Sequence, residues 1–272
     1  MAGKVVTDGK RIEIKLKKRY PEIEFDKLQI YCGIPHTVDV ESASGSIEIT
    51  VPTVGDIVKF GQKKFDETLN IFTTNTTSYR LLLWKQGIDW NEISDFDLFC
   101  MLYKQIDDEA ASMLFKDVRW SDFIIYGKEL DGVQSIVLYN PQTEVEVNEE
   151  VYQNIAQYLR VAFNISPEEK ITKDANLKAL YIRKDESALQ RAAAEPQNKD
   201  SSLQPLISAC INHPGFKYNL KEVMDLSIPV FYDSVKRLQL YENATALMKG
   251  MYSGMIDGSK INPESYNFMK AI

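Results

Sequence analysis

Histidine and cysteine, two residue types that often bind zinc or carry out nucleophilic chemistry, are scarce in this sequence. The 272 residues include two histidines, His36 in GIPHT and His213 in NHPG, and both stand in proline-containing turns. We therefore expect turn histidines and no metal site. The three cysteines, Cys32, Cys100 and Cys210, are odd in number and far apart. That pattern argues against a disulfide framework and favours buried thiols in a reducing compartment.

Long apolar runs and the common hydrolase and nucleotide-binding motifs are also missing. No stretch approaches the roughly 18 apolar residues of a membrane span. The first residues, MAGKVVTDGK, lack the apolar core of a secretory signal. The chain has no Gly-x-Ser-x-Gly elbow, no phosphate-binding loop and no dinucleotide glycine fingerprint. We therefore predict a cytoplasmic protein without a membrane anchor, catalytic residues, a metal or a cofactor.

Positive charge is in short supply, because 32 basic residues stand against 39 acidic ones and the net charge is −7. An acidic chain is repelled by a phosphate backbone unless its basic residues gather in one place. The compact basic cluster is Lys15, Lys17, Lys18 and Arg19. We interpret it as the solvent-exposed edge of a strand, where lysines prevent pairing with another strand. We expect no binding of nucleic acid.

The residues that are present change their periodicity along the chain. Strict alternation at 11–17, 28–32 and 47–51 predicts a small antiparallel sheet in the first fifty residues. Short β-prone stretches bounded by turn residues predict a second β region in the middle of the chain. Its three strands are expected at 123–126, 135–139 and 144–147.

Apolar residues at helical spacing occupy much of the rest. The predicted helices cover 54–72 with an interruption at Gly61, 79–86, a segment that begins at Ser94, 108–115 and 149–163. Thr53 and Ser94 are suitable caps. The fold class that follows is α+β and mostly helical, with small antiparallel β elements near the N-terminus and in the middle, and a helical C-terminal unit.

The longest helical pattern runs from Leu226 to Ile256. The Ser227 hydroxyl is expected to cap this helix, and proline in its first turn is harmless. Its apolar stripe consists of Phe231, Val235, Leu238, Leu247, Met248, Met251 and Met255. We expect the stripe as far as Leu238 to face a core. Met248, Met251 and Met255 are a possible partner-contact surface, because methionine side chains adapt to many partners.

Residues 164–202 mark a boundary in the predicted domain organisation. The second half of this segment has no large apolar residue beyond Leu189. We therefore predict an exposed, mobile helix followed by a linker at 195–202. The predicted units are an α+β domain at 1–163, the exposed helix and linker at 164–202, and the helical C-terminal unit at 203–272.

Four stretches carry a resemblance to proteins of tailed bacteriophages that infect Gram-positive bacteria. They are VPTVGDIVKFGQKKF at 51–65, GIDWNEISDFDLF at 87–99, LISACINHPGFKYN at 206–219 and FYDSVKRLQLYENATALMKGMYSGMID at 231–257. The resemblance spans most of the chain beyond residue 45 and implies a structural or assembly-module protein, either a tail-assembly chaperone or a baseplate-associated protein. The partners that it implies are tail-tube, tape-measure or baseplate proteins, met in the host bacterial cytoplasm or in the virion. It assigns no catalytic residue and leaves the oligomeric state open.

Three other functions stay open at the level of sequence. One is a phage enzyme whose carboxylates converge only in the fold. Asp95 and Asp97, and the acidic run 107–109, lie too close in sequence to face each other as a catalytic pair, and helix capping explains them more simply. The others are a nucleic-acid-associated phage protein and a phage protein that binds a host factor.

Overall fold

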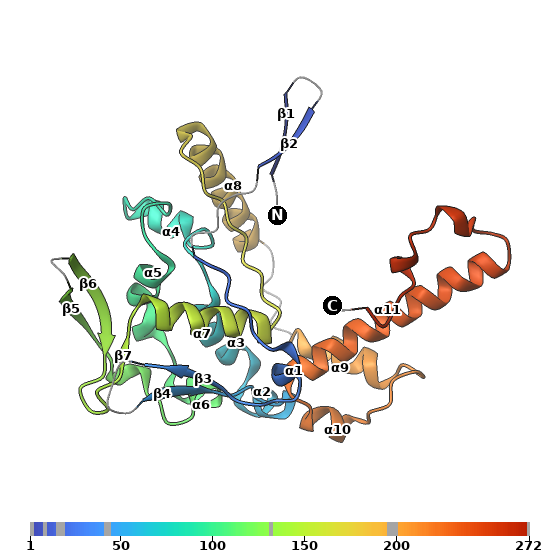
Figure 1. Cartoon of the computed structure of the whole chain (residues 1–272), viewed down its shortest axis with the longest axis horizontal. Helices are drawn as coiled ribbons and strands as arrows, with labels where there is room; N and C mark the ends of the chain where they lie inside the picture. Colours follow the sequence, from blue (N-terminus) through green and yellow to red (C-terminus); the bar gives the residue numbers. More distant parts are fainter. Residues whose placement is uncertain are drawn as a thin grey trace.

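The structure is a computed structural model that describes residues 3–7, 10–14, 20–40, 45–130, 133–194 and 201–270. It confirms the predicted fold class, because helices predominate and the strands form small antiparallel sheets (Figure 1). The α-helices are α1 (Lys27–Tyr31), α2 (Val54–Phe60), α3 (Gln62–Thr73), α4 (Arg80–Lys85), α5 (Asp95–Leu102), α6 (Asp108–Phe115), α7 (Glu149–Ala162), α8 (Ala175–Ala194), α9 (Leu203–Ile211), α10 (Leu220–Asp225) and α11 (Ile228–Tyr252). Short 3-10 helices are η1 (Tyr103–Gln105), η2 (Trp120–Asp122), η3 (Gly258–Lys260) and η4 (Pro263–Ser265).

The strands pair in antiparallel fashion with their neighbours in sequence. They are β1 (Gly3–Thr7), β2 (Lys10–Ile14), β3 (His36–Asp39), β4 (Ser46–Ile49), β5 (Ile124–Leu130), β6 (Val133–Tyr139) and β7 (Glu146–Val147). β1 pairs with β2, β3 pairs with β4, and β6 lies between β5 and β7. The strands predicted around 47–51 and in the middle of the chain are confirmed. The predicted strand at 11–17 is confirmed as far as residue 14, and the basic cluster at 15–19 lies outside the described residues.

The predicted strand at 28–32 is wrong, because residues 28–31 belong to helix α1. One oxygen of the Asp26 carboxylate caps this helix by accepting from the N–H groups of Leu28 (2.9 Å) and Gln29 (3.3 Å). Within α1 only Ile30 is buried, and Leu28 is 69% exposed. The capping hydrogen bonds of Asp26 therefore favour a helix in this segment, although its apolar residues alternate as in a half-buried strand.

The predicted helix starts in the first half of the chain are confirmed in atomic detail. Thr53 with Asp56, and Ser94 with Asp97, each form a capping box. In each box the hydroxyl accepts from the third residue's N–H and the carboxylate accepts from the cap's own N–H. Gly61 separates α2 from α3 at φ +114°, a conformation that a side chain would strain.

Five aromatic side chains form the centre of the core. Phe72, Phe99, Phe115 and Trp120 contact one another with ring centroids 4.8–5.5 Å apart. Tyr152 of α7 stacks on Phe99 at 4.7 Å, and each of the five is at most 1% exposed. Rings of this size contribute a large apolar area, so their packing holds α3, α5, α6 and α7 together.

A short backbone bridge joins the start of α11 to the start of α2. The Val54 N–H donates to Leu226 O (2.9 Å), and the Ile228 N–H donates to Pro52 O (3.1 Å). Ser227 lies between these two bonds at the start of α11, but its hydroxyl makes no capping hydrogen bond. The predicted Ser227 cap is therefore wrong, and the first N–H of the helix, that of Ile228, is satisfied by a carbonyl 176 residues earlier in the chain.

The hydrophobic core continues across the predicted unit boundaries. Residues of the C-terminal unit that join it are Leu203, Ile207, Cys210, Val223, Ile228 and Phe231. Helices α2 and α10 approach closely, since a Cβ added to Gly55 would lie 2.8 Å from Met224 O. The division at 1–163, 164–202 and 203–272 stays a prediction, and the structure shows one core shared between the first unit and the last.

Residues 164–174, which open the predicted boundary segment, are tied to the first half of the chain through their backbone. Trp90 Nε1 donates to Lys170 O (2.9 Å), and Asn75 Nδ2 donates to Glu168 O (3.0 Å). These bonds require no large apolar side chain within the segment. Composition therefore contained no sign of them.

Helix α8 is the predicted exposed helix, and it is held along its first half. Ile182 is 5% exposed and joins the core, and the Asp185 carboxylate pairs with Arg80 at 2.5 Å. Every residue from 187 to 194 is exposed. The mobility of this helix stays a prediction, and residues 195–200 of the predicted linker lie outside the described residues.

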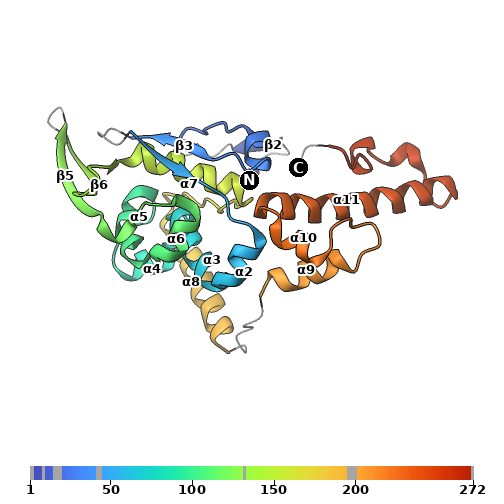
Figure 2. The ribbon, with the colours of Figure 1, turned by 90° about the horizontal axis from the view of Figure 1, so that it is seen from below.

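Several elements project from the body of the molecule. The β5–β6 hairpin, α8 and the far half of α11 extend in different directions (Figures 1 and 2). The accessible surface is 17454 Å², whereas a compact monomer of this mass exposes about 12,000 Å². The chain therefore carries a large excess of surface for its size. Across the described ranges, none of the helices has both the length and the apolar character of a membrane span.

Candidate functional site

Helix α11 leaves the body soon after it begins. Within its 25 residues only Ile228, Phe231 and Ala244 are buried. Val235 and Leu238 are partly buried and pack on the core, so the expected core-facing part of the stripe is confirmed for these positions. Figure 2 shows the rest of the helix extending past α9 and α10. We call residues 239–270 the arm.

The end of the chain folds back along α11 and completes the arm. After η3 and η4 the chain returns toward the base of the helix. There Arg237 Nη1 donates to the carbonyl oxygens of Phe268 (2.9 Å) and Lys270 (2.6 Å). The Tyr241 and Phe268 rings meet edge to face with centroids 5.4 Å apart. One helix and its own returning segment therefore build the arm.

The tip of the arm is a fixed turn. Gly254 adopts φ +74° just after α11, and its N–H donates to Met251 O (3.1 Å). The Ile256 N–H donates to Gly250 O (3.1 Å), and a Cβ added to Gly250 would lie 2.5 Å from Ile256 Cδ1. This is the glycine-terminated helix end in which a following apolar residue packs back on the last turn. The helix thus ends at Tyr252, earlier than the predicted Ile256.

Two large apolar side chains stand outside this turn. Tyr252 is 88% exposed and Met255 is 87% exposed. Of the three methionines predicted as a partner-contact surface, Met248 and Met251 are half-buried, and the Met251 sulfur lies 3.0 Å from where a Cβ on Gly258 would be. Met255 alone of the three is fully presented, and Tyr252 beside it was not predicted. Partner contact by these residues stays a prediction.

A groove of about 1560 Å³ lies where α7, α1, α11 and the segment after α7 meet. Its walls carry charges of both signs, from Lys27, Arg160, Lys170, Lys236, Arg237, Glu22, Asp95, Glu168, Glu169 and Asp233. A groove of mixed sign has no uniform field to attract a polyanion. Burial, and then a hydrogen bond to Glu149, raises the pKa of Tyr20 at its edge, so this phenol stays neutral.

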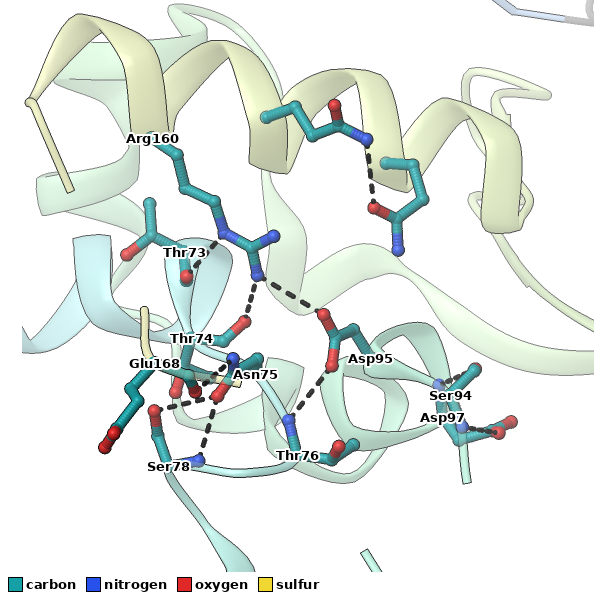
Figure 3. A network of polar contacts seen from close by, with 12 residues as sticks. Thr73, Thr74, Asn75, Thr76, Ser78, Ser94, Asp95, Asp97, Arg160 and Glu168 are labelled. Carbon is teal, nitrogen blue, oxygen red and sulfur yellow. Dashed lines mark hydrogen bonds and ion pairs between the residues drawn. The ribbon is translucent and has the colours of Figure 1, made fainter. Parts of the chain in front are cut away.

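A buried ion pair lies in the wall of this groove (Figure 3). Arg160 Nη2 lies 3.4 Å from Asp95 Oδ2, with these side chains 15% and 7% exposed. The guanidinium also donates to Thr73 O (2.8 Å) and Thr74 O (2.5 Å), and Asp95 Oδ1 accepts from the Thr76 N–H (3.0 Å). Arginine thus covers the negative end of α3, where helix carbonyls lack partners. The arrangement ties α3, α5 and α7 together, and sequence reasoning missed Arg160 altogether.

The other acids singled out in the sequence mark helix starts and turns, as the capping interpretation predicts. Asp97 completes the Ser94 capping box, and Asp107 caps α6 through the N–H groups that follow it. Asp108 accepts from the Trp120 N–H at 2.8 Å. Each of these carboxylates therefore has a backbone partner that accounts for its position.

Both histidines contact neighbouring side chains. His36 Nε2 lies 2.8 Å from Asn154 Oδ1, and its ring stacks on Tyr158 with centroids 4.5 Å apart. His213 Nε2 lies 3.3 Å from Glu242 Oε1 on α11. His213 lies in a turn as predicted and connects it to α11, whereas His36 is the first residue of β3, so the turn prediction is wrong for His36 and its contacts connect β3 to α7.

Two cysteine–histidine pairs have the spacing of metal ligands. The interpretation of the histidines as turn residues did not consider these pairs. They are Cys32 with His36 and Cys210 with His213. Among the residues that the structure describes, no group of three or more His, Cys, Asp or Glu side chains could hold a metal ion. Cys100 and Cys210 are buried as predicted and burial raises both thiol pKa values, whereas Cys32 is exposed, so the buried-thiol prediction is wrong for it.

Comparison with known proteins gives a family match for the end of the chain. The model of the family described as YomV second domain matches residues 195–272, a range that includes the whole arm. YomV is a Bacillus phage-region protein, so the match points to a phage-related protein. No curated protein and no solved structure matches this chain.

Proposed function

We propose that this chain is a non-enzymatic bacteriophage tail-morphogenesis protein that acts through protein–protein contacts, as a tail-assembly chaperone or a baseplate or tail component. One observation carries the proposal: the arm ends in a fixed turn that presents Tyr252 and Met255 almost completely to solvent. The family match over 195–272 supports a phage setting. The resemblance of 231–257 to phage assembly proteins supports a role for the arm during tail assembly.

The physical case for a contact rests on how these side chains are held. Tyrosine and methionine are enriched at the centres of protein interfaces. The turn is already ordered by Gly250, Gly254 and Ile256, so binding costs little additional conformational entropy. The partner expected is a tail-tube, tape-measure or baseplate protein with an apolar pocket, met in the host cytoplasm during assembly or retained in the virion.

Removal of the two tip side chains tests the proposal. The double variant Tyr252→Ala, Met255→Ala is expected to fold and melt like the native chain, because both side chains are exposed. It should fail to complement a phage that lacks the gene, and electron microscopy should show particles without normal tails. Leu177→Ala with Leu189→Ala, at 40% and 57% exposed on α8, is the matched control and should restore the titre. Full complementation by the tip variant would overturn the proposal.

The non-enzymatic part of the proposal has its own test. Asp97→Asn, Asp108→Asn and His213→Gln each remove an ionisable group while keeping a polar side chain of similar size. All three are expected to complement normally, since the partners of these side chains are structural. Complete loss of complementation from any one of them, with fold and abundance preserved, would favour an enzyme.

A further inference from the structure

Among the described residues, the outer edge of β5 in the β5–β6 hairpin has no partner strand. β6 is the middle strand of its sheet and pairs with both β5 and β7, whereas β5 has only β6 beside it within the described residues. Figures 1 and 2 show the hairpin standing clear of the helices. An unpaired edge of this kind presents a row of N–H and C=O groups to any strand that approaches it.

Both faces of β5 are apolar and open to solvent. Ile124, Ile125 and Tyr126 follow one another, so they alternate between the two faces of the sheet, and they are 46%, 52% and 54% exposed. Ile136 on β6 adds a fourth side chain at 49%. Antiparallel sheets commonly cover one face with a core and turn a polar face to water. Over these residues β5 has apolar side chains open to solvent on both faces, and exposed apolar patches are typical of interaction surfaces.

The strand is held in place and lacks the usual protection of an edge. Phe123, just before β5, is fully buried, and its carbonyl accepts from the Tyr103 hydroxyl at 3.2 Å. Residues 124–127 contain no proline and no charge. The first charged residue of β5, Lys128, lies 3.1 Å from both carboxylate oxygens of Glu146, across the sheet from the free edge. Lys104 Nζ donates to Ser121 O (3.0 Å) and Phe123 O (2.9 Å), so this lysine protects the backbone just before β5, whereas residues 124–127 have no such protection.

We propose that two copies of this chain pair through β5 in antiparallel fashion about a two-fold axis at Ile125. The two three-stranded sheets then form one continuous sheet of six strands. In this register Ile125 lies opposite Ile125 of the second copy, and Ile124 lies opposite Tyr126 of the second copy. Apolar side chains meet on both faces over residues 124–126, and beyond them Lys128 lies opposite Asp122 of the second copy, a pair of opposite charges. A two-fold contact uses the same patch twice, which suits an edge whose two halves are both apolar.

The area available sets the strength of this dimer. Four half-exposed side chains supply on the order of 400 Å² per copy, about half of the roughly 800 Å² per partner in stable complexes. The dimer is therefore weak and forms at high local concentration. This pairing is independent of the function proposed for the arm, because it uses a surface at the opposite end of the molecule (Figure 1).

Sedimentation equilibrium of the full chain, from roughly 1 µM to 1 mM, tests the pairing. We expect a monomer–dimer equilibrium. Ile125→Lys places two like charges opposite each other on the axis and should weaken dimerisation at least about tenfold. Leu177→Lys on α8, also at an exposed leucine, is the matched control and should leave the equilibrium unchanged. Circular dichroism verifies that each variant is folded.

Cross-linking tests the register. Ile125→Cys in a Cys32→Ser background places two thiols across the axis, where opposite Cβ atoms lie about 4.5–5.5 Å apart. Mild oxidation should then give a covalent dimer, whereas Ile136→Cys, on the middle strand and equally exposed, should stay monomeric. A chain that is monomeric up to about 1 mM, or a dimer insensitive to Ile125→Lys, would overturn the pairing. Cross-linking at position 136 in place of 125 would do so as well.

Discussion

Arg160 is the single residue on which three helices depend. Its guanidinium reaches two carbonyl oxygens at the end of α3 and the Asp95 carboxylate of α5. Arg160→Ala would leave that carboxylate, 7% exposed, without its ionic partner. Breaking a buried pair from one side in this way is expected to lower the free energy of unfolding by about 3–5 kcal/mol, which urea titration measures.

An exposed ion pair supplies the control for this change. Lys63 and Glu67 lie 3.8 Å apart on α3 with side chains 88% and 64% exposed. Lys63→Ala should cost at most about 0.5 kcal/mol, because water screens such a pair. If Arg160→Ala cost no more than Lys63→Ala, Arg160 would not hold these helices together.

The cysteines provide a second prediction at the residue scale. Cys32 is exposed, whereas burial, and to a lesser extent the nearby Asp97 charge, raises the pKa of Cys100 to about 12. A raised pKa means less thiolate at pH 8, and thiolate is the reactive form. We expect one thiol per chain to react rapidly with Ellman's reagent in the folded protein and three after unfolding. A rapid thiol that persists in Cys32→Ser would contradict this assignment.

Among the elements, α2 and α10 approach each other closely. A methyl group on Gly55 would lie 2.8 Å from the backbone oxygen of Met224, which cannot move without shifting α10. Gly55→Ala is therefore expected to lower the free energy of unfolding by about 1–3 kcal/mol through overpacking. Gly127→Ala, where an added Cβ meets nothing within 4 Å, is the control and should cost far less in the same denaturant titration. Equal stability of the two variants would show that α10 does not dock this closely.

Helix α8 is attached along only part of its length, which predicts where proteases cut. Its residues from 187 onward are all exposed, whereas Lys170 is tied by backbone bonds to Thr77 Oγ1 and Trp90 Nε1. Brief trypsin digestion should cleave after Arg191 before it cleaves after Lys170, because proteases require a segment that opens locally. Mass spectrometry of the first fragments identifies the site. Early cleavage after Lys170 would mean that the anchoring of 164–174 is weaker than these bonds indicate.

The whole molecule is more extended than a globule of its length. A compact chain of 272 residues has a radius of gyration of about 19 Å. The arm, α8 and the β5–β6 hairpin extend away from the centre (Figures 1 and 2). Small-angle X-ray scattering at low concentration is therefore expected to give a radius of gyration clearly above about 19 Å. A value at the compact limit would show that the arm folds against the body in solution.

Sequence by itself determined the features that depend on neighbouring residues. The helix starts at Thr53 and Ser94 and the extent of α6 depend on atoms only a few residues apart, so composition and spacing were sufficient to predict them. The wrong strand prediction at 28–32 also has a local cause, because the Asp26 cap favours a helix over residues whose alternating pattern predicts a strand.

Only the tertiary structure decided which faces and charges meet. Arg160 and Asp95 are 65 residues apart, and the backbone that satisfies the start of α11 comes from the start of α2. The stripe on α11 predicted that Phe231 would face a core, but not that Met251 would be half-buried while Met255 is 87% exposed. The physical reason is that periodicity reports the geometry of one helix, whereas burial depends on what the rest of the chain brings against it.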